Sequence, residues 1–110
     1  MELIEFSKDQ TIILRIVGRL DSTTFTKFEE KLTHVMNAGF KDIHIDLKNM
    51  DFVSSTGLRV FLIGLKRMNE TNGTFTLYNM QPNIREIFEI SGFTKIFPIV
   101  EKSPLDISSL

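Results

Sequence analysis

Strand-like and helix-like segments alternate along most of this chain of 110 residues. Runs rich in β-branched and aromatic residues predict strands over residues 1–6, 11–17, 41–47, 74–78 and 95–100. Apolar residues at helical spacing predict helices over residues 22–38, 55–68 and 82–91. Because strands joined by single helices form right-handed β-α-β units, this order predicts an α/β fold with a mostly parallel sheet of four or five strands and helices packed against it. The first two strands are close enough to form a hairpin, which would add one antiparallel edge strand.

The predicted strands differ in how far they should be covered. Residues 11–17 are β-branched and nearly all apolar, which suits a strand that is buried on both faces. Residues 41–47 alternate polar and apolar, which is typical of a half-covered strand. We expect Gly18–Asp21 to break the second strand, and residues 48–53 to form a connector.

Capping signals bound two of the helices. Asp21 or Ser22 is the expected N-cap of the first helix, and Gly39 is placed to stop it. Pro82 at a first helical position begins the last helix, and Gly92 ends it. One apolar stripe of the first helix is expected to face the core: Phe25, Phe28, Leu32, Val35 and Met36.

Composition restricts the class of protein. A net charge of −1 provides no electrostatic footprint for nucleic acid or an anionic membrane. The chain has no cysteine, so it has no disulfide or thiolate metal site. No apolar run approaches the roughly 20 residues that span a bilayer, and residues 1–6 do not resemble a signal peptide. We therefore expect a cytoplasmic protein with one domain over residues 1–101 and a tail over residues 102–110.

Three hydroxyl residues, Ser54, Ser55 and Thr56, precede Gly57 between a strand-like segment and a helix. Small hydroxyl side chains at a helix start can cap the backbone, and Ser54 is the expected N-cap. A hydroxyl at this place can also accept a phosphate, because free N–H groups and the helix dipole favour negative charge there. The residues alone leave both interpretations open, and Gly57 fits either one by permitting close backbone approach.

The sequence lacks the usual catalytic arrangements. A serine nucleophile needs a base within reach, and the two histidines are placed on the first helix (His34) and in the middle of a strand (His44). Two histidines without clustered carboxylates make a poor metal site, and no Gly-rich phosphate loop is present. We expect no catalytic residue, cofactor or metal.

The segment Val53–Leu58 resembles the signature of STAS domains, which include the bacterial anti-sigma factor antagonists. In that family a strand leads to an Asp-Ser-Ser/Thr-Gly-Leu turn that opens the second main helix. The middle serine is phosphorylated by a partner anti-sigma factor that is itself a protein kinase. The resemblance implies that Ser55 is the phosphoacceptor, Thr56 the next hydroxyl and Gly57–Leu58 the start of the helix. This chain has Ser54 where the family often has aspartate.

A second motif carries the same resemblance. Gly18–Asp21 is similar to the family's Gly-x-Leu-Asp corner, whose acidic residue lies near the phosphorylation loop. The resemblance thus groups Asp21 with the loop as a partner-binding site, whereas the residues alone equally support Asp21 as a helix cap. The residues of this expected site are Asp21, Ser54, Ser55, Thr56, Gly57 and Leu58.

The resemblance implies a non-catalytic switch in transcription regulation. Unphosphorylated, the domain would bind an anti-sigma factor, a serine protein kinase, and so free a sigma factor. Phosphorylation of Ser55 would release the kinase, and a partner phosphatase would reset the switch. The alternative is a STAS-type scaffold or transporter accessory module that binds protein partners without phosphorylation. An enzyme or small-ligand-binding domain is a third interpretation, which the missing catalytic groups disfavour.

Overall fold

The computed structural model describes residues 1–101, so the predicted tail over residues 102–110 lies outside the described residues. The elements in chain order are β1 (Glu2–Lys8), β2 (Thr11–Leu20), α1 (Phe25–Asn37), β3 (Asp42–Asp46), β4 (Met50–Val53), α2 (Ser55–Glu70), β5 (Thr74–Tyr78), α3 (Pro82–Ile90), the 3-10 turn η1 (Phe93–Lys95) and β6 (Ile99–Val100). Within the described part, no helix is both long and apolar enough to span a bilayer.

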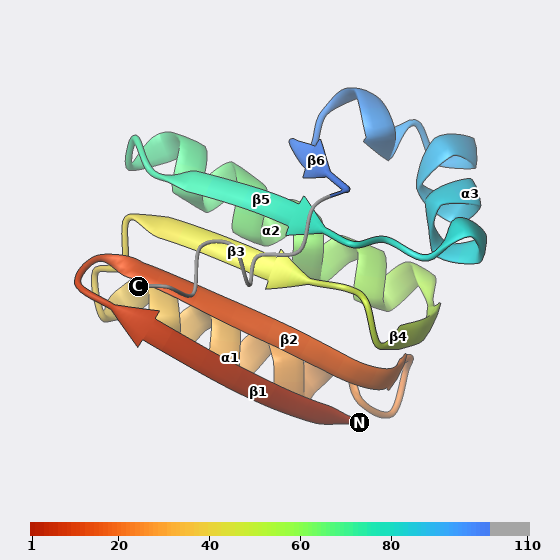
Figure 1. The fold of residues 1–110 in the computed structure, drawn as a ribbon, viewed down its shortest axis with the longest axis horizontal. Helices are drawn as coiled ribbons and strands as arrows, with labels where there is room; N and C mark the ends of the chain where they lie inside the picture. Colours follow the sequence, from red (N-terminus) through yellow and green to blue (C-terminus); the bar gives the residue numbers. More distant parts are fainter. Residues whose placement is uncertain (102–110) are drawn as a thin grey trace.

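The sheet has the strand order β1-β2-β3-β5-β6, and β4 pairs separately with the end of β2. The β1–β2 pair is antiparallel and every other pair is parallel (Figure 1). This arrangement confirms the predicted α/β fold with one antiparallel edge strand, but the sheet of the described residues has six strands instead of four or five, because β4 was not predicted. The last strand is shorter than predicted, because η1 ends at Lys95 and residues 96–98 form a turn before β6 begins at Ile99.

The end of β2 contradicts the predicted strand break. The strand continues through Leu20: it pairs with β3 as far as Arg15 and with β4 from Gly18 onward, and the register with β4 shifts between Gly18 and Arg19. Gly18 has a φ of +97°, a backbone conformation that glycine adopts without strain. The predicted connector over residues 48–53 therefore contains a strand, β4, that only this bend in β2 makes possible.

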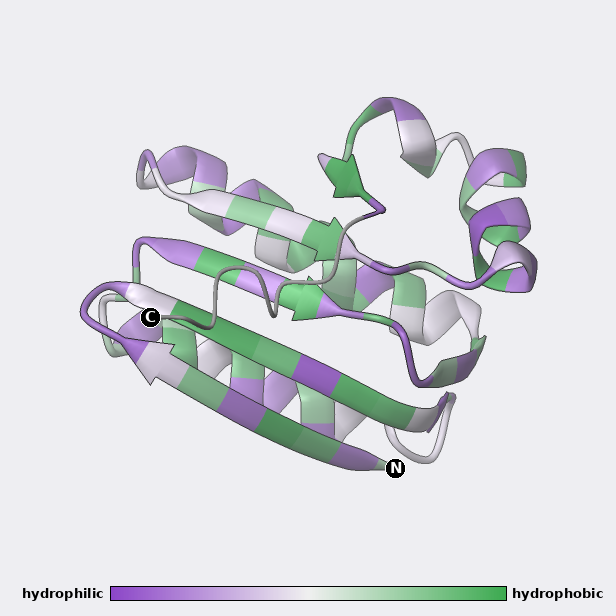
Figure 2. Cartoon of the chain, viewed as in Figure 1, coloured by the Kyte–Doolittle hydropathy of each residue, from purple (hydrophilic) through white to green (hydrophobic). Residues whose placement is uncertain are grey.

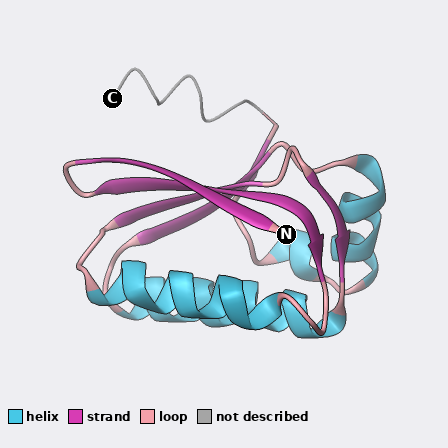
Figure 3. Cartoon of the chain, turned by 90° about the horizontal axis from the view of Figure 1, so that it is seen from below, coloured by secondary structure: helices cyan, strands magenta, loops and turns pink. Residues whose placement is uncertain are grey.

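The hydrophobic core lies between one face of the sheet and the helices, with α1 and α2 side by side along that face (Figure 3). Phe61 of α2 lies at its centre, with ring centroids 5.1 Å from Phe28 of α1 and 5.8 Å from Phe88 of α3. All three rings are fully buried, and burial of one such side chain contributes about 1.5–3 kcal/mol. Figure 2 shows that β2 is hydrophobic along most of its length, whereas hydrophobic and hydrophilic residues alternate along the helices.

Strand β3 is more deeply buried than its alternating pattern predicts. His44 is 6% exposed and Asp46 is 0% exposed, although both face away from the core. Asp46 accepts a hydrogen bond of 3.0 Å from the Nε of Arg15, and His44 is hydrogen-bonded to Asp42 and lies against the ring of Tyr78. The prediction of a half-covered strand is wrong because side chains of the neighbouring strands, Arg15 on β2 and Tyr78 on β5, lie against these groups.

Candidate functional site

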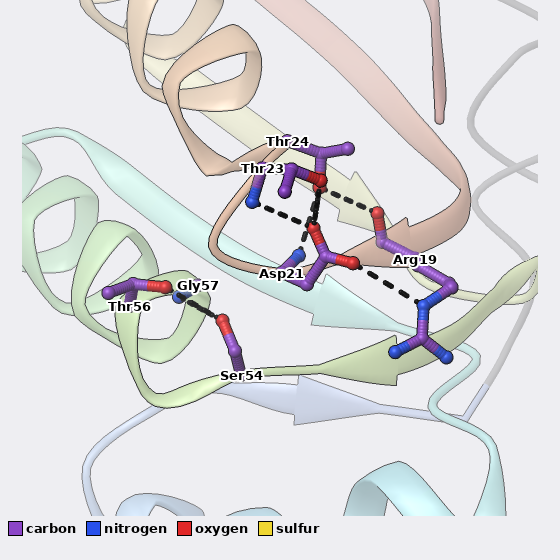
Figure 4. Close-up of polar contacts among 7 residues, drawn as sticks. All are labelled: Arg19, Asp21, Thr23, Thr24, Ser54, Thr56 and Gly57. Carbon is purple, nitrogen blue, oxygen red and sulfur yellow. Dashed lines mark hydrogen bonds and ion pairs between the residues drawn. The ribbon is translucent and has the colours of Figure 1, made fainter.

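The ends of β2 and β4 meet at the start of α2, and this meeting point brings the two predicted motifs together. Leu20 pairs with Val53 in the parallel ladder, and the Ser54 N–H donates to the Leu20 carbonyl at 2.9 Å. The Gly18–Asp21 corner therefore lies beside the hydroxyl loop. Figure 4 shows the polar contacts of Arg19, Asp21, Thr23 and Thr24 at the corner and of Ser54, Thr56 and Gly57 at the loop.

Ser54 is the N-cap of α2, as predicted. Its Oγ accepts the Gly57 N–H at 3.1 Å, and its extended backbone is the conformation typical of a cap. A hydrogen bond of 2.8 Å also joins the hydroxyls of Ser54 and Thr56. Both of these half-buried hydroxyls are thus engaged in holding the first turn of the helix.

Ser55 differs from the two hydroxyl residues beside it. It is the first residue of α2, it is exposed, and its hydroxyl makes no hydrogen bond within residues 1–101. The loop therefore presents one free hydroxyl to solvent at a helix start.

Gly57 and Leu58 support the loop from inside. A Cβ on Gly57 would lie 2.9 Å from Cγ of Leu20 and 3.1 Å from its carbonyl oxygen, which is closer than packed atoms approach. Leu58 is 8% exposed and belongs to the core. Both residues were predicted within a partner-binding site, and the structure buries both of them beneath the loop.

The start of α1 corrects a prediction. Neither Asp21 nor Ser22 is its N-cap: the helix begins at Phe25, and Thr24 is in the cap position. The carbonyl of Asp21 accepts the N–H groups of Thr24 and Phe25, while the Thr24 hydroxyl accepts the Asp21 N–H at 2.9 Å. The polar residues that were predicted to cap the helix form an additional turn before it, because their side chains make hydrogen bonds to other groups of that turn.

The carboxylate of Asp21 is held by this turn. Its Oδ1 accepts the Thr23 hydroxyl at 2.7 Å and the Thr23 N–H at 2.9 Å, and its Oδ2 lies 3.4 Å from the Nε of Arg19. Hydrogen bonds from Thr23, first from its hydroxyl and then from its N–H, lower the pKa of Asp21 from 3.8 to about 2. The Asp21 carboxylate therefore stays ionised at neutral pH, beside the guanidinium of Arg19.

Arg19 is a site residue that the sequence did not reveal. Its guanidinium lies 4.1 Å from the ring centroid of Phe52, which is close enough for a cation–π contact, and its Nε reaches Asp21. Arg19 and Phe52 are direct partners in the β2–β4 register. Because β4 was not predicted, no sequence signal placed these two residues together.

The two histidines lie away from this loop. His34 is exposed on α1, where it helps to line a groove of about 450 Å³ between α1 and α2, and His44 is buried in the sheet. The groove includes none of the loop residues. Among the described side chains, no group of three or more His, Cys, Asp or Glu residues is arranged to hold a metal ion.

The sequence model of the STAS domain matches residues 4–104. This chain belongs to the STAS domain family. BtrV of Bordetella bronchiseptica, which is named as an anti-sigma factor antagonist, is 34% identical over 99 residues that cover 90% of this chain and 85% of BtrV.

Solved structures of STAS proteins share the fold. A structure from Thermotoga maritima, also named as an anti-sigma factor antagonist, superposes with a TM-score of 0.88 at 18% identity, covering 97% of this chain and 92% of that one. The phosphorylated form of the Bacillus cell fate determinant SpoIIAA superposes with a TM-score of 0.80 at 17% identity, covering 98% and 97% of the two chains. These structures share the fold, and the match to the family model confirms the STAS assignment from the sequence.

Proposed function

We propose that this protein is an anti-sigma factor antagonist that is switched by phosphorylation of Ser55. Unphosphorylated, it binds an anti-sigma factor that is a serine protein kinase, and so makes a sigma factor available for transcription in the bacterial cytoplasm. Phosphorylation of Ser55 by that kinase ends the complex, and a serine phosphatase restores the first state. The observation that carries this proposal is the exposed, unbonded hydroxyl of Ser55 at the start of α2.

The hydrogen bonds of the loop support Ser55 as the acceptor. A kinase must reach the acceptor oxygen from solvent and must be free to remove its proton. The hydroxyls of Ser54 and Thr56 bond to each other, and Ser54 also caps the helix, so modification of either would disrupt the first turn. Modification of Ser55 leaves these contacts in place.

The electrostatics of the loop support a switch that acts without unfolding. A phosphoserine carries about −1.5 to −2 charges at pH 7. At the first residue of α2, this charge meets the favourable end of the helix dipole. Asp21 beside the loop is already paired with Arg19, so the phosphate adds negative charge that this pair does not offset. A partner that binds the neutral loop then meets new charge and bulk.

The surface around Ser55 offers features that suit a protein partner. Leu62 and Ile63 on α2 are exposed apolar side chains, at 38% and 41%. Arg19 and Asp21 add a fixed pair of opposite charges at the edge of the loop. An apolar centre with a polar rim is the usual composition of a specific protein interface.

The acceptor assignment is tested by incubating the protein with ATP and the anti-sigma kinase encoded in the same genome, followed by mapping of the phosphate by mass spectrometry. We expect one phosphate on Ser55 in the wild type and in Thr56→Ala, and none in Ser55→Ala. Unmodified wild type, or undiminished phosphorylation of Ser55→Ala, refutes the assignment.

The effect of charge is tested separately by titration calorimetry with the same kinase. We expect Ser55→Asp to weaken binding at least tenfold, which corresponds to about 1.4 kcal/mol. Ser55→Asn, which has nearly the same shape without the charge, is the matched control and should bind almost as the wild type does. Equal affinities of the Asp and Asn variants would show that charge is not the switch.

Ser54 favours one alternative. This chain has a hydroxyl where relatives with a phosphorylation cycle often have an aspartate, as the resemblance implies, and the hydroxyl acts as a cap. A scaffold or transporter accessory module that binds partners without phosphorylation would need only the capped loop. This alternative is supported if the wild type binds its partner but carries no phosphate after incubation with the kinase and ATP.

A further inference from the structure

Arg59 lies on the exposed face of α2, four residues after Ser55. Side chains four residues apart on a helix are neighbours, with Cβ atoms about 5–6 Å apart. Helical side chains also lean toward the N-terminus of their helix, so this spacing puts the turn that contains Ser55 within reach of the Arg59 guanidinium.

Arg59 has no bonding partner in the unphosphorylated domain. Its side chain makes no hydrogen bond, ion pair or ring contact within residues 1–101, whereas Arg19 is held by Asp21 and Arg67 bonds to Asn37. The only acidic residue in the sequence of α2 is at its far end, Glu70. The helix that begins at Ser55 therefore carries a free cation one turn away.

We propose that Arg59 is the counter-charge that binds the phosphate once it is attached to Ser55. The planar guanidinium donates two parallel N–H bonds to phosphate oxygens, which is the geometry that arginine forms with phosphate in general. This inference rests on the proposed phosphorylation of Ser55, and it deepens the proposed function by naming the residue that receives the new charge.

The pairing gives phosphorylation two effects on the partner surface. Before phosphorylation, Arg59 is available to a carboxylate on a partner. Afterwards it is engaged by the phosphate, so the surface loses an accessible cation at the same time as it gains an anion. Arg59 thus takes part in the switch by binding the phosphate on Ser55.

The test measures the second ionisation of the phosphate by ³¹P NMR. Phosphoserine is installed at position 55 by genetic-code expansion, so that no kinase is needed. A positive charge about 5 Å away in water favours the doubly charged phosphate, and we expect its acid dissociation constant to be about fourfold larger in the wild type than in Arg59→Gln. Arg59→Lys, which retains the charge without the fork, should fall between the two.

Lys66→Gln is the matched control. Lys66 is another exposed cation of α2, eleven residues from Ser55 and so about 16 Å along the helix axis, which exceeds the screening length of about 10 Å in 0.1 M salt. We expect this variant to titrate as the wild type does. An unchanged titration in Arg59→Gln, or an equal change in Lys66→Gln, overturns the proposal.

The two proposals fail in different experiments. If the kinase does not modify Ser55, the proposed function fails while the titration of installed phosphoserine still reports whether Arg59 binds it. If the kinase modifies Ser55 but the Arg59→Gln titration is unchanged, only the role of Arg59 is refuted. Because Arg59 is exposed and unpaired, circular dichroism of the variants should match that of the wild type.

Discussion

Ser54→Ala removes the oxygen that accepts the Gly57 N–H at 3.1 Å, whereas Ser55→Ala removes a hydroxyl without a hydrogen bond in the described structure. Loss of a serine N-cap costs about 1 kcal/mol in proteins generally. Gly57 is buried, so its N–H is poorly placed to find water instead, and an unsatisfied buried donor costs about 1–3 kcal/mol. We therefore expect Ser54→Ala to lower the free energy of unfolding by about 1–2 kcal/mol, and Ser55→Ala to change it by less than about 0.5 kcal/mol.

Equilibrium unfolding in urea, followed by circular dichroism, measures both changes. With a slope of about 2 kcal/mol per molar urea, the midpoint of Ser54→Ala should fall by roughly 0.5–1 M. Ser54→Asp is the control, because its carboxylate can accept the same N–H and its charge suits a helix start, so this variant should be as stable as the wild type. Equal losses for Ser54→Ala and Ser55→Ala, or a Ser54→Asp as unstable as Ser54→Ala, would refute the division of roles between the two serines.

Three further predictions concern Gly57 in the loop, Asp21 at the corner beside it and the buried charge pair of the sheet. Gly57→Ala forces a Cβ against Leu20 and should cost about 1–3 kcal/mol in urea unfolding, and a variant as stable as the wild type would contradict the packing argument. Asp21 has a pKa of about 2, so its contribution to stability is present above pH 3.8 and is lost as the pH falls through about 2. An NMR titration of its carboxyl carbon should have its midpoint at about pH 2. Thr23→Val should raise this pKa, because it removes a hydroxyl that donates to the carboxylate. Asp46→Asn removes the charge that pairs with the guanidinium of Arg15 on β2, and it should lower the free energy of unfolding by roughly 2–4 kcal/mol. A loss as small as that of an ordinary surface substitution would contradict a stabilising role for this pair.

Most of the fold could be predicted because strand and helix periodicity are local properties. The apolar run over residues 11–17 and the helical stripe that begins at Phe25 each indicate an element without any knowledge of its neighbours. Strand β4 could not be predicted in this way. It is only four residues long and contains a charged residue, and it becomes a strand because the bend at Gly18 brings the end of β2 beside it.

The part of the candidate site that depends on local sequence could be predicted, and the part that depends on contacts between distant segments could not. Ser54 as a cap follows from residue type and spacing, and the structure bears it out. Asp21 was misassigned as a possible cap of α1, because residue type alone does not distinguish a cap from a turn whose side chains bond to one another. The contact between Arg19 and Phe52 depends on a strand pairing that local pattern does not contain.

The sequence by itself determined the order of the strands and helices other than β4, the STAS signature and the three hydroxyls at the start of one helix, since all of these depend on neighbours in the chain. Only the tertiary structure decided which hydroxyl is free. The first turn of α2 is held against the Leu20 carbonyl and side chain from a distant strand, and this packing directs the Ser54 and Thr56 hydroxyls into the turn while Ser55 faces solvent. Hydrogen-bond partners supplied across the fold cannot be found in a local pattern, because they depend on which segments the core brings together.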